Sequence, residues 1–186
     1  MSDVENTARQ IPSSFRSQAE AFDYFDSLSV TSVTELAGLW RGHGVACGHP
    51  LDGVLENLGW YGKRFTTDHR ADALLFAVGP HRLVAIDPEM IPLKLVLRFH
   101  RFGRTRIARS WFSYLQKMWR ANGPVASLRP MFFRGKTSAA MVYDRQPITD
   151  HFRRIDDNRL LGAMVVEGDS RHYFFVLTRT IADGIR

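Results

Sequence analysis

Two carboxylates and an imidazole lie close together in the sequence, at Asp144, Asp150 and His151. A carboxylate or imidazole that is buried among apolar groups acquires a shifted pKa, which suits it to proton transfer. If the protein is an enzyme, these three residues are the candidates for general acid–base catalysis, and Tyr61 or Tyr143 is the candidate hydrogen-bond donor. A structural role is the alternative, because polar strand residues commonly serve strand pairing and turns.

The alternation of residues 148–156 predicts a strand, in which successive side chains point to opposite faces. Asp150 then shares a face with Phe152, whereas His151 lies on the other face. Asp150 and His151 therefore cannot act as a neighbouring dyad within that strand.

Aromatic and basic residues around a glycine form a candidate binding site at residues 60–65. Two aromatic rings and two cations can bind a molecule with an apolar body and an anionic end, such as a fatty acid or an aromatic acid. Solvated cations beside interfacial aromatic rings are the alternative. With one tyrosine from further along the chain, the candidate ligand-binding residues are Trp60, Tyr61, Lys63, Arg64 and Tyr143.

The sequence contains no motif for a metal, a nucleotide or a nucleophilic serine. The seven histidines have no H-x-x-x-H or H-E-x-x-H spacing, and the single cysteine, Cys47, excludes an intramolecular disulfide. There is no phosphate-binding loop, no dinucleotide fingerprint and no G-x-S-x-G elbow. We therefore expect neither a metal nor a cofactor.

The elements that position these residues are expected to form one domain. Residues 1–12 are predicted to be a polar tail, and residues 13–186 suit a single domain. A helix is predicted to begin at the serines of residues 13–14, with phenylalanines along one stripe. Two strands are expected at residues 73–78 and 82–86, around a Gly-Pro turn.

The strongest helix signal covers residues 105–121. Ile107, Trp111 and Leu115 form an apolar stripe, and basic residues lie largely on the other side. We expect this stripe to pack across a sheet or the mouth of a barrel. The alternative is that residues 105–120 lie on an anionic membrane surface, with aromatic side chains inserted.

From residue 126 onward the hydrophobic period changes to two. Short strand-like runs follow at about ten-residue spacing with turn residues between them, which indicates an antiparallel meander. Closing the meander with the N-terminal strands would remove its exposed edges. The five runs are residues 126–134, 137–144, 148–156, 159–167 and 171–180.

The net charge of +6 is unevenly distributed. Residues 90–143 contain no Asp or Glu but hold 11 of the 25 Lys and Arg residues. A region of one sign favours an anionic partner, such as a carboxylate or phosphate ligand or a membrane surface, unless acids from its flanks fold back against it. Nucleic acid is not expected, because the basic residues are not interleaved with aromatic residues in the pattern of a known module.

A glycine-framed tryptophan, G-x-W-x-G, occupies residues 38–42. It is combined with Arg-Gly-Lys at 134–136, Tyr-Asp-Arg-Gln-Pro-Ile at 143–148 and Leu-Leu-Gly-Ala-Met at 160–164. Together these motifs resemble the bacterial GXWXG proteins, in which the N-terminal motif is paired with a C-terminal domain of unknown function. The resemblance covers roughly residues 36–65 and 126–180.

A G-x-W motif that enters a first strand, with an arginine on the last strand, is also similar to the calycins, such as lipocalins and nitrobindin-like barrels. This resemblance implies that Trp40 closes one barrel end, with Arg179 over its ring, and that Gly38 and Gly42 are structural. Stacking of the Trp40 ring on a ligand is the functional alternative. Haem bound through His172 is a minor hypothesis that the nitrobindin-like resemblance implies.

The sequence thus predicts an α+β, mainly antiparallel β fold: a barrel-like, calycin-like meander with an N-terminal helix and one long inserted amphipathic helix. We expect a cytoplasmic small-molecule binding protein with an apolar, aromatic pocket for an anionic hydrophobic ligand. A cofactor-independent isomerase, lyase or hydrolase that uses the same pocket is the alternative. Acids near the start oppose a secretory signal, and no apolar run approaches the ~18 residues of a membrane span.

Overall fold

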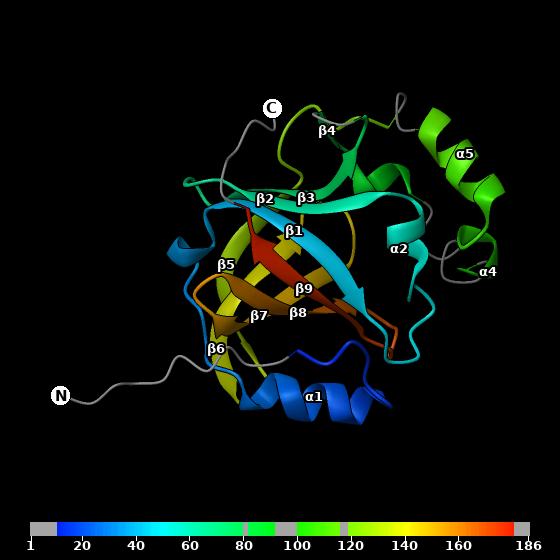
Figure 1. Cartoon of the computed structure of the whole chain (residues 1–186). Coiled ribbons are helices and arrows are strands. Elements are labelled where there is room, and N and C mark those ends of the chain that lie inside the picture. Colours follow the sequence, from blue (N-terminus) through cyan, green and yellow to red (C-terminus); the bar gives the residue numbers. More distant parts are fainter. Residues whose placement is uncertain (1–10, 80–81, 92–99, 116–118, 181–186) are drawn as a thin grey trace.

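The computed structural model describes residues 11–79, 82–91, 100–115 and 119–180. Within these residues the chain forms a nine-stranded, mainly antiparallel sheet with a few helices outside it (Figure 1). The strands are β1 (Gly38–Val45), β2 (Trp60–Phe65), β3 (Arg70–Ala77), β4 (Leu83–Ala85), β5 (Ala126–Phe133), β6 (Lys136–Tyr143), β7 (Ile148–Asp156), β8 (Arg159–Val166) and β9 (Tyr173–Arg179). The helices are α1 (Gln18–Ser27), α2 (Val54–Asn57), α4 (His100–Gly103) and α5 (Arg106–Leu115), and the 3-10 turns are η1 (Thr34–Leu36) and η2 (Pro88–Met90).

The predicted five-strand meander is confirmed. Strands β5 to β9 pair consecutively and antiparallel, and their bounds differ from the predicted runs by at most two residues. The turn between β5 and β6 has Arg134 and Gly135 at φ 49° and 77°. Positive φ at both central residues matches the twist of the flanking strands, which explains why a glycine follows the arginine there.

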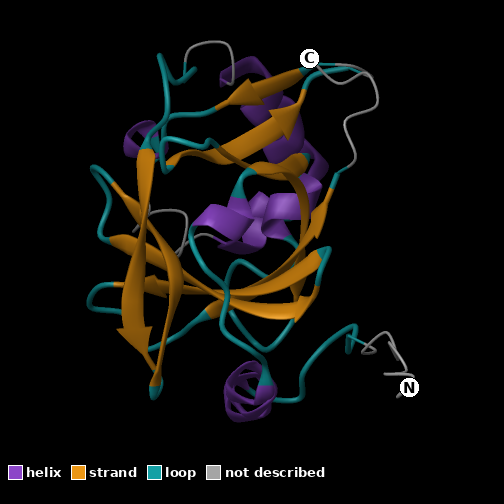
Figure 2. Ribbon diagram, turned by 90° about the vertical axis from the view of Figure 1, so that its left-hand side faces the viewer, coloured by secondary structure: helices purple, strands orange, loops and turns teal. Residues whose placement is uncertain are grey.

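The strands pair in a closed ring. The order is β2-β1-β9-β8-β7-β6-β5-β3-β4, and β2 pairs with β3 as well as with β1. All strands except β4 therefore lie in the ring, and β4 is added to β3 (Figures 1 and 2). This closure pairs the edges that a meander alone would expose.

Aromatic side chains fill the inside of the ring by packing against glycines on neighbouring strands. A Cβ atom on any of these glycines would overlap the aromatic ring or hydroxyl that faces it, so no larger residue fits there without a shift of that side chain. The resulting core is dense and aromatic. The contacting pairs are Gly42 with Trp60, Gly44 with Tyr173, and Gly162 with Phe175.

Helix α1 covers part of the outer face of the ring (Figure 1). Phe25 of α1 packs there in a cluster that includes Phe174 and Val176 of β9. The prediction that the helix begins at residues 13–14 is wrong. Helix α1 begins at Gln18, because the Phe15 amide donates to Ala46 O at 2.8 Å and keeps the preceding segment extended.

The predicted helix of residues 105–121 is wrong at its C-terminal end. Helix α5 spans Arg106–Leu115. By Trp119 the chain has left the helix, because the Asp87 amide donates to Trp119 O at 2.9 Å and Arg120 forms an antiparallel bridge with Ile86. Trp119 and Arg120, which the sequence pattern predicted to be helical, therefore pair with the sheet edge beside β4.

The sequence pattern placed the buried face of α5 on the stripe of Ile107 and Trp111, widened by Phe112, and this expectation is only partly correct. Ala108 and Phe112 are buried, and the Phe112 ring lies 4.7 Å from the Phe76 ring. Ile107 and Trp111 are 61% and 65% exposed. Apolar residues occur at two adjacent positions in each turn, and only one of the two rows meets the sheet. No helix in the described residues is long and apolar enough to cross a membrane.

Candidate functional site

A lysine, an aspartate and a tyrosine from three strands meet inside the ring. Nζ of Lys63 on β2 lies 2.9 Å from Oδ2 of Asp150 on β7, and the two side chains are only 3% and 1% exposed. The same Nζ donates to Ala73 O at 2.9 Å and to the Tyr143 hydroxyl at 3.3 Å. The buried ammonium therefore has three polar neighbours, of which the hydroxyl is the most distant.

Three aromatic rings surround this ammonium. Nζ of Lys63 lies 5.1 Å from the ring centroid of Phe175 and 5.7 Å from those of Trp60 and Tyr143. Rings at such distances attract a cation through their electron-rich faces, and they also exclude water from it. The site is therefore a charged centre in an otherwise apolar enclosure.

The enclosure shifts the protonation of both acidic partners of the lysine. Burial raises the pKa of the Asp150 carboxyl, while the ion pair with Lys63 acts in the opposite direction. Burial, reinforced by the nearby Asp150 charge, raises the pKa of the Tyr143 hydroxyl well above its usual value. Tyr143 thus remains a neutral donor, and Asp150 is a carboxylate that can accept a proton more readily than an exposed one.

A bulge in β2 turns Lys63 inward. The register between β2 and β3 shifts on both sides of Gly62, which has φ 149°. Trp60 and Lys63 consequently both face the interior although three positions separate them. The next residue, Arg64, faces outward, where its guanidinium lies 3.5 Å from Asp72 Oδ2.

A pocket of about 800 Å³ lies where β1 and β2 separate. The two strands pair only as far as Arg41 and Gly62, although β1 continues to Val45. Trp60 lines this pocket and also stands against Lys63; its Nε1 is buried without a hydrogen-bond partner. The remaining lining residues are Arg41, Gly42, His43, Glu56, Thr178, Arg179 and Thr180.

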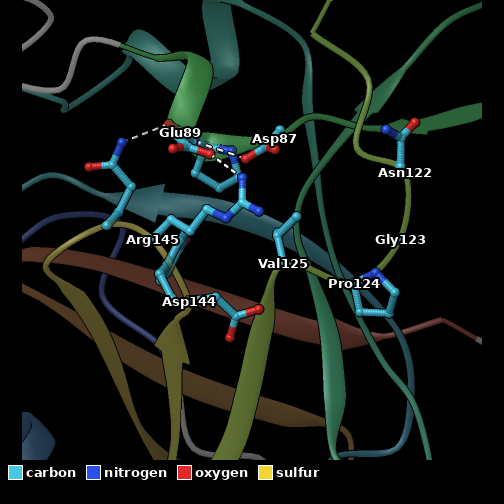
Figure 3. A pocket seen from close by; sticks show the side chains of 11 residues that line it. Asp87, Glu89, Asn122, Gly123, Pro124, Val125, Asp144 and Arg145 are labelled. Atoms are coloured by element: carbon cyan, nitrogen blue, oxygen red, sulfur yellow. Dashed lines mark hydrogen bonds and ion pairs between the residues drawn. The ribbon is translucent and has the colours of Figure 1, made fainter.

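A second pocket, of about 330 Å³, lies at the rim where β6 ends. Tyr143 and Asp144 belong to its lining, and Figure 3 shows Arg145 reaching across it to Glu89. Asp144 forms an ion pair with Arg70 on β3, which lies two strands away from β6 in the sheet. Trp60 and Tyr143, which both contact Lys63, thus line two different pockets on either side of the charged centre.

The three candidate catalytic residues do not come together. Asp150 lies inside the ring, Asp144 lies on the rim, and His151 faces outward and stacks on Phe133 with the ring centroids 3.9 Å apart. Burial, reinforced by the Arg153 charge, lowers the pKa of His151 to about 4. His151 is therefore neutral near pH 7 and lies on the opposite face of the strand from Asp150.

The buried His151 should make the fold sensitive to acid. In the unfolded chain this imidazole takes up a proton below about pH 6.5, whereas the folded protein resists protonation down to about pH 4. A folded-state pKa below the unfolded one means that the free energy of unfolding falls as the pH drops through this window, by roughly 2–3 kcal/mol. Urea denaturation at pH 7 and pH 4.5 measures this loss. Between the two pH values, the free energy of unfolding of His151→Phe should fall clearly less than that of the native protein. An equal loss in the variant would assign the acid sensitivity to other groups.

Two candidate ligand-binding residues lie away from the charged centre. The Tyr61 hydroxyl is 3.3 Å from Thr180 Oγ1, and Arg64 pairs with Asp72 on the outside of the ring. Lys63 and Arg64 therefore face opposite sides of the strand and cannot both meet one head group inside the ring.

The glycine-framed tryptophan seals one part of the core. Trp40 is 1% exposed, and its Nε1 donates to Leu36 O at 2.6 Å. The contact that the calycin resemblance implied is present: Cζ of Arg179 lies 4.3 Å from the Trp40 ring centroid. The same guanidinium donates to Ala37 O at 2.8 Å and to Glu35 O at 2.6 Å, so it fixes the segment that leads into β1. Gly38 has φ 130°, and a Cβ atom there would come within 3.2 Å of the guanidinium.

His172 does not face the inside of the ring. It precedes β9, and its ring lies 4.9 Å from the Phe22 ring of α1 on the outer side. The hypothesis of a haem held inside the ring through His172 is therefore wrong. In the part of the chain that the structure describes, no group of three or more His, Cys, Asp or Glu residues is arranged to hold a metal ion.

The sequence did not indicate the residues that line the pocket between β1 and β2. Arg41, His43 and Glu56 belong to different elements, and they share a pocket only because the two strands diverge after Arg41. The pairing of Lys63 with Asp150 carried a partial signal, since each is an ionisable residue within an apolar strand pattern.

Comparison with known proteins agrees with this architecture. The chain is similar to a protein from Thermomonospora curvata whose crystal structure is known, with 28% sequence identity, a TM-score of 0.65 and 91% of each chain covered. No curated protein matches the chain.

Two family models match successive parts of the chain. The model described as GXWXG protein matches residues 23–79, and the model described as domain of unknown function DUF4334 matches residues 124–179. The first match contains β1, β2 and β3, and the second contains the whole meander from β5 to β9. The chain therefore combines a GXWXG domain with the paired domain of unknown function DUF4334, as the motifs at residues 38–42 and 134–164 predicted.

Proposed function

We propose that the protein binds a small molecule with an apolar body and an anionic head group, and that Lys63 provides the cation for the head group. The observation that carries this proposal is the buried Lys63 ammonium, enclosed by three aromatic rings. The pocket between β1 and β2 supports it, because its volume of about 800 Å³ suits a small ligand and Trp60 separates it from the lysine. A turn of the Trp60 side chain would join the pocket to the charged centre.

The partners of Lys63 suit an exchange with an incoming carboxylate. The Tyr143 hydroxyl, at 3.3 Å, is the most distant partner and the easiest to displace. Asp150 and the ligand carboxylate would then lie beside the same lysine. Their mutual repulsion disfavours two ionised carboxylates in one site. Since burial already raises the pKa of Asp150, we expect Asp150 to take up a proton when the ligand binds. Arg41 at the pocket mouth would attract the anion.

Binding of dodecanoate and of a naphthoic acid, measured by calorimetry, tests this function. The Lys63→Met/Asp150→Leu variant removes both charges without leaving one of them unpaired, and we expect it to weaken binding at least tenfold, since a charge-assisted hydrogen bond contributes about 1.5–3 kcal/mol. In the native protein the heat should depend on the ionisation enthalpy of the buffer, with uptake of up to about one proton per ligand.

The matched control for this experiment is Arg64→Met, which removes the neighbouring cation on the outer face and should leave the affinity unchanged. Equal affinity in the double variant and the native protein would reject Lys63 as the head-group cation. Binding without proton uptake would reject the role of Asp150 while leaving the pocket in place.

A cofactor-independent enzyme is the second candidate function. It is favoured by the contact of Lys63 with both Asp150 and Tyr143, which combines a carboxylate of raised pKa with two donors in one dry site. Asp150 would accept or return a proton, and Tyr143 would stabilise negative charge on an oxygen. Exchange of a ligand C–H hydrogen for deuterium, present in the native protein and absent in Asp150→Asn, would distinguish the enzyme from a binding protein.

We also propose a calycin-like relationship and a cytoplasmic location. The closed ring of strands and the Arg179–Trp40 contact support the first. The single cysteine, Cys47, which is buried and reduced, supports the second.

A further inference from the structure

Helices α4 and α5 expose apolar side chains that a folded monomer would be expected to bury. Phe102 is 53% exposed, and Ile107 and Trp111 are 61% and 65% exposed. Ile107 and Trp111 are four positions apart on α5 and therefore share one face of that helix. Figure 1 shows α4 and α5 at one edge of the molecule, apart from α1.

Arginines accompany these apolar side chains. Arg104, Arg106 and Arg109 are exposed, and among the described residues no carboxylate forms an ion pair with any of the three. Two acids next to residues 90–143 in the sequence pair with arginines outside that region: Asp144 with Arg70, and Glu89 with Arg145. We call the combination the apolar–basic face; it comprises Phe102, Arg104, Arg106, Ile107 and Trp111, whereas Arg109 lies on the opposite side of α5 from Ile107 and Trp111.

We propose that the apolar–basic face docks the protein on the surface of a bilayer that contains anionic lipids. An interfacial helix needs an apolar side that enters the acyl boundary and cations that meet the lipid phosphates, and this face provides both. Tryptophan suits that depth because one end of its ring system is apolar and the other donates a hydrogen bond. The cations favour an anionic surface over a neutral one.

Docking on this face would bring the pocket between β1 and β2 close to the bilayer. Asn57 at the end of α2 donates through Nδ2 to Gly103 O at 2.8 Å and to Thr105 O at 3.0 Å. Helix α2 carries Glu56, which lines that pocket, and leads directly into β2 at Trp60. If the proposed function holds, an apolar anion could pass between bilayer and pocket; the docking itself does not depend on it.

Cosedimentation of the full chain with lipid vesicles tests the docking. We expect binding to vesicles of phosphatidylcholine mixed with phosphatidylglycerol, and much weaker binding to phosphatidylcholine alone. Trp111→Ser should reduce the partition coefficient about tenfold through loss of apolar burial. Arg104→Glu/Arg106→Glu should reduce the partition coefficient by more than tenfold, at about fivefold for each lost cation, and added salt should act in the same direction.

Matched controls lie on β5. Phe132 is 72% exposed and Arg129 is also exposed, so Phe132→Ser and Arg129→Glu make the same chemical changes outside the apolar–basic face, and they should leave vesicle binding unchanged. Equal loss in the control variants, or equal binding to both kinds of vesicle, would overturn the proposal. So would a dimer in solution that Trp111→Ser converts to a monomer, since a second copy of the chain would then cover the face. Ligand titration without vesicles tests the pocket separately.

Discussion

Replacing Asp150 with alanine is expected to lower the free energy of unfolding by about 3–5 kcal/mol, because the Lys63 ammonium would remain buried without its carboxylate. Lys63 is only 3% exposed and cannot reach water from its position among three aromatic rings. Its remaining partners, Ala73 O and the Tyr143 hydroxyl, are neutral and cannot compensate for the charge. The loss should appear in urea denaturation at pH 7 as a lower midpoint with an unchanged slope.

The double variant Lys63→Met/Asp150→Leu should recover most of that loss. Replacement of a buried ion pair by apolar residues of similar volume is often neutral or stabilising, by about 1–4 kcal/mol. The partly exposed pair of Arg64 and Asp72 provides the matched control, and Asp72→Ala should cost no more than about 1 kcal/mol. If Asp150→Ala and Asp72→Ala prove equally mild, the charged centre is hydrated and the site described above is open to solvent.

Gly62→Ala is expected to destabilise the protein by about 3 kcal/mol or more, in the range where a single substitution indicates one defined structural defect. Gly62 has φ 149°, and a Cβ atom there would overlap the carbonyl oxygen of Trp40 on the paired strand β1. A backbone oxygen cannot rotate away as a side chain can, so β1 and β2 would have to separate. The bulge that turns Lys63 inward would be lost with the same change.

Gly53→Ala is the matched control, because it places an alanine at a positive φ without the steric overlap found at Gly62. Gly53 has φ 75°, but nothing lies within 4 Å of a Cβ atom there. The free energy of unfolding of this variant should fall by only about 1–2 kcal/mol, which is the cost of a non-glycine residue in the left-handed region. Thermal denaturation of both variants, followed by near-ultraviolet circular dichroism, measures the difference. A Gly62→Ala protein as stable as Gly53→Ala would contradict the close approach of the two strands.

Period-two alternation and turn residues were sufficient to predict the meander from β5 to β9. Each strand there pairs with its sequence neighbour, so local pattern and tertiary pairing agree. The same alternation predicted that Asp150 and Phe152 share one face of their strand, but it did not decide which face points inward. The buried face of α5 could not be predicted from local pattern. Its sequence has two adjacent apolar rows, and only the contact with Phe76 determines that Phe112 is buried.

The candidate site depended on long-range geometry that no local pattern encodes. Lys63 and Asp150 were both recognised as candidates, but for different functions, because they belong to different family segments and meet only when the ring closes. The bulge at Gly62 reverses the direction that simple alternation from Trp60 would give Lys63. No local pattern encodes the pocket between β1 and β2 either, because that pocket exists only where the two strands diverge.

The pairing of β1 with β9 has a consequence for how the chain reaches its native state. The first strand joins the last one, from Trp40 opposite Arg179 to Val45 opposite Phe174. During synthesis β1 therefore has no partner on that side until β9 has left the ribosome, and the ring cannot close before then. Because the loop-closure entropy of such distant contacts is offset only when they form, ring closure should be a slow, late step of folding. The GXWXG segment on its own should then behave as an unfinished sheet that needs the second segment, supplied in cis or as a separate fragment, to become a stable structure.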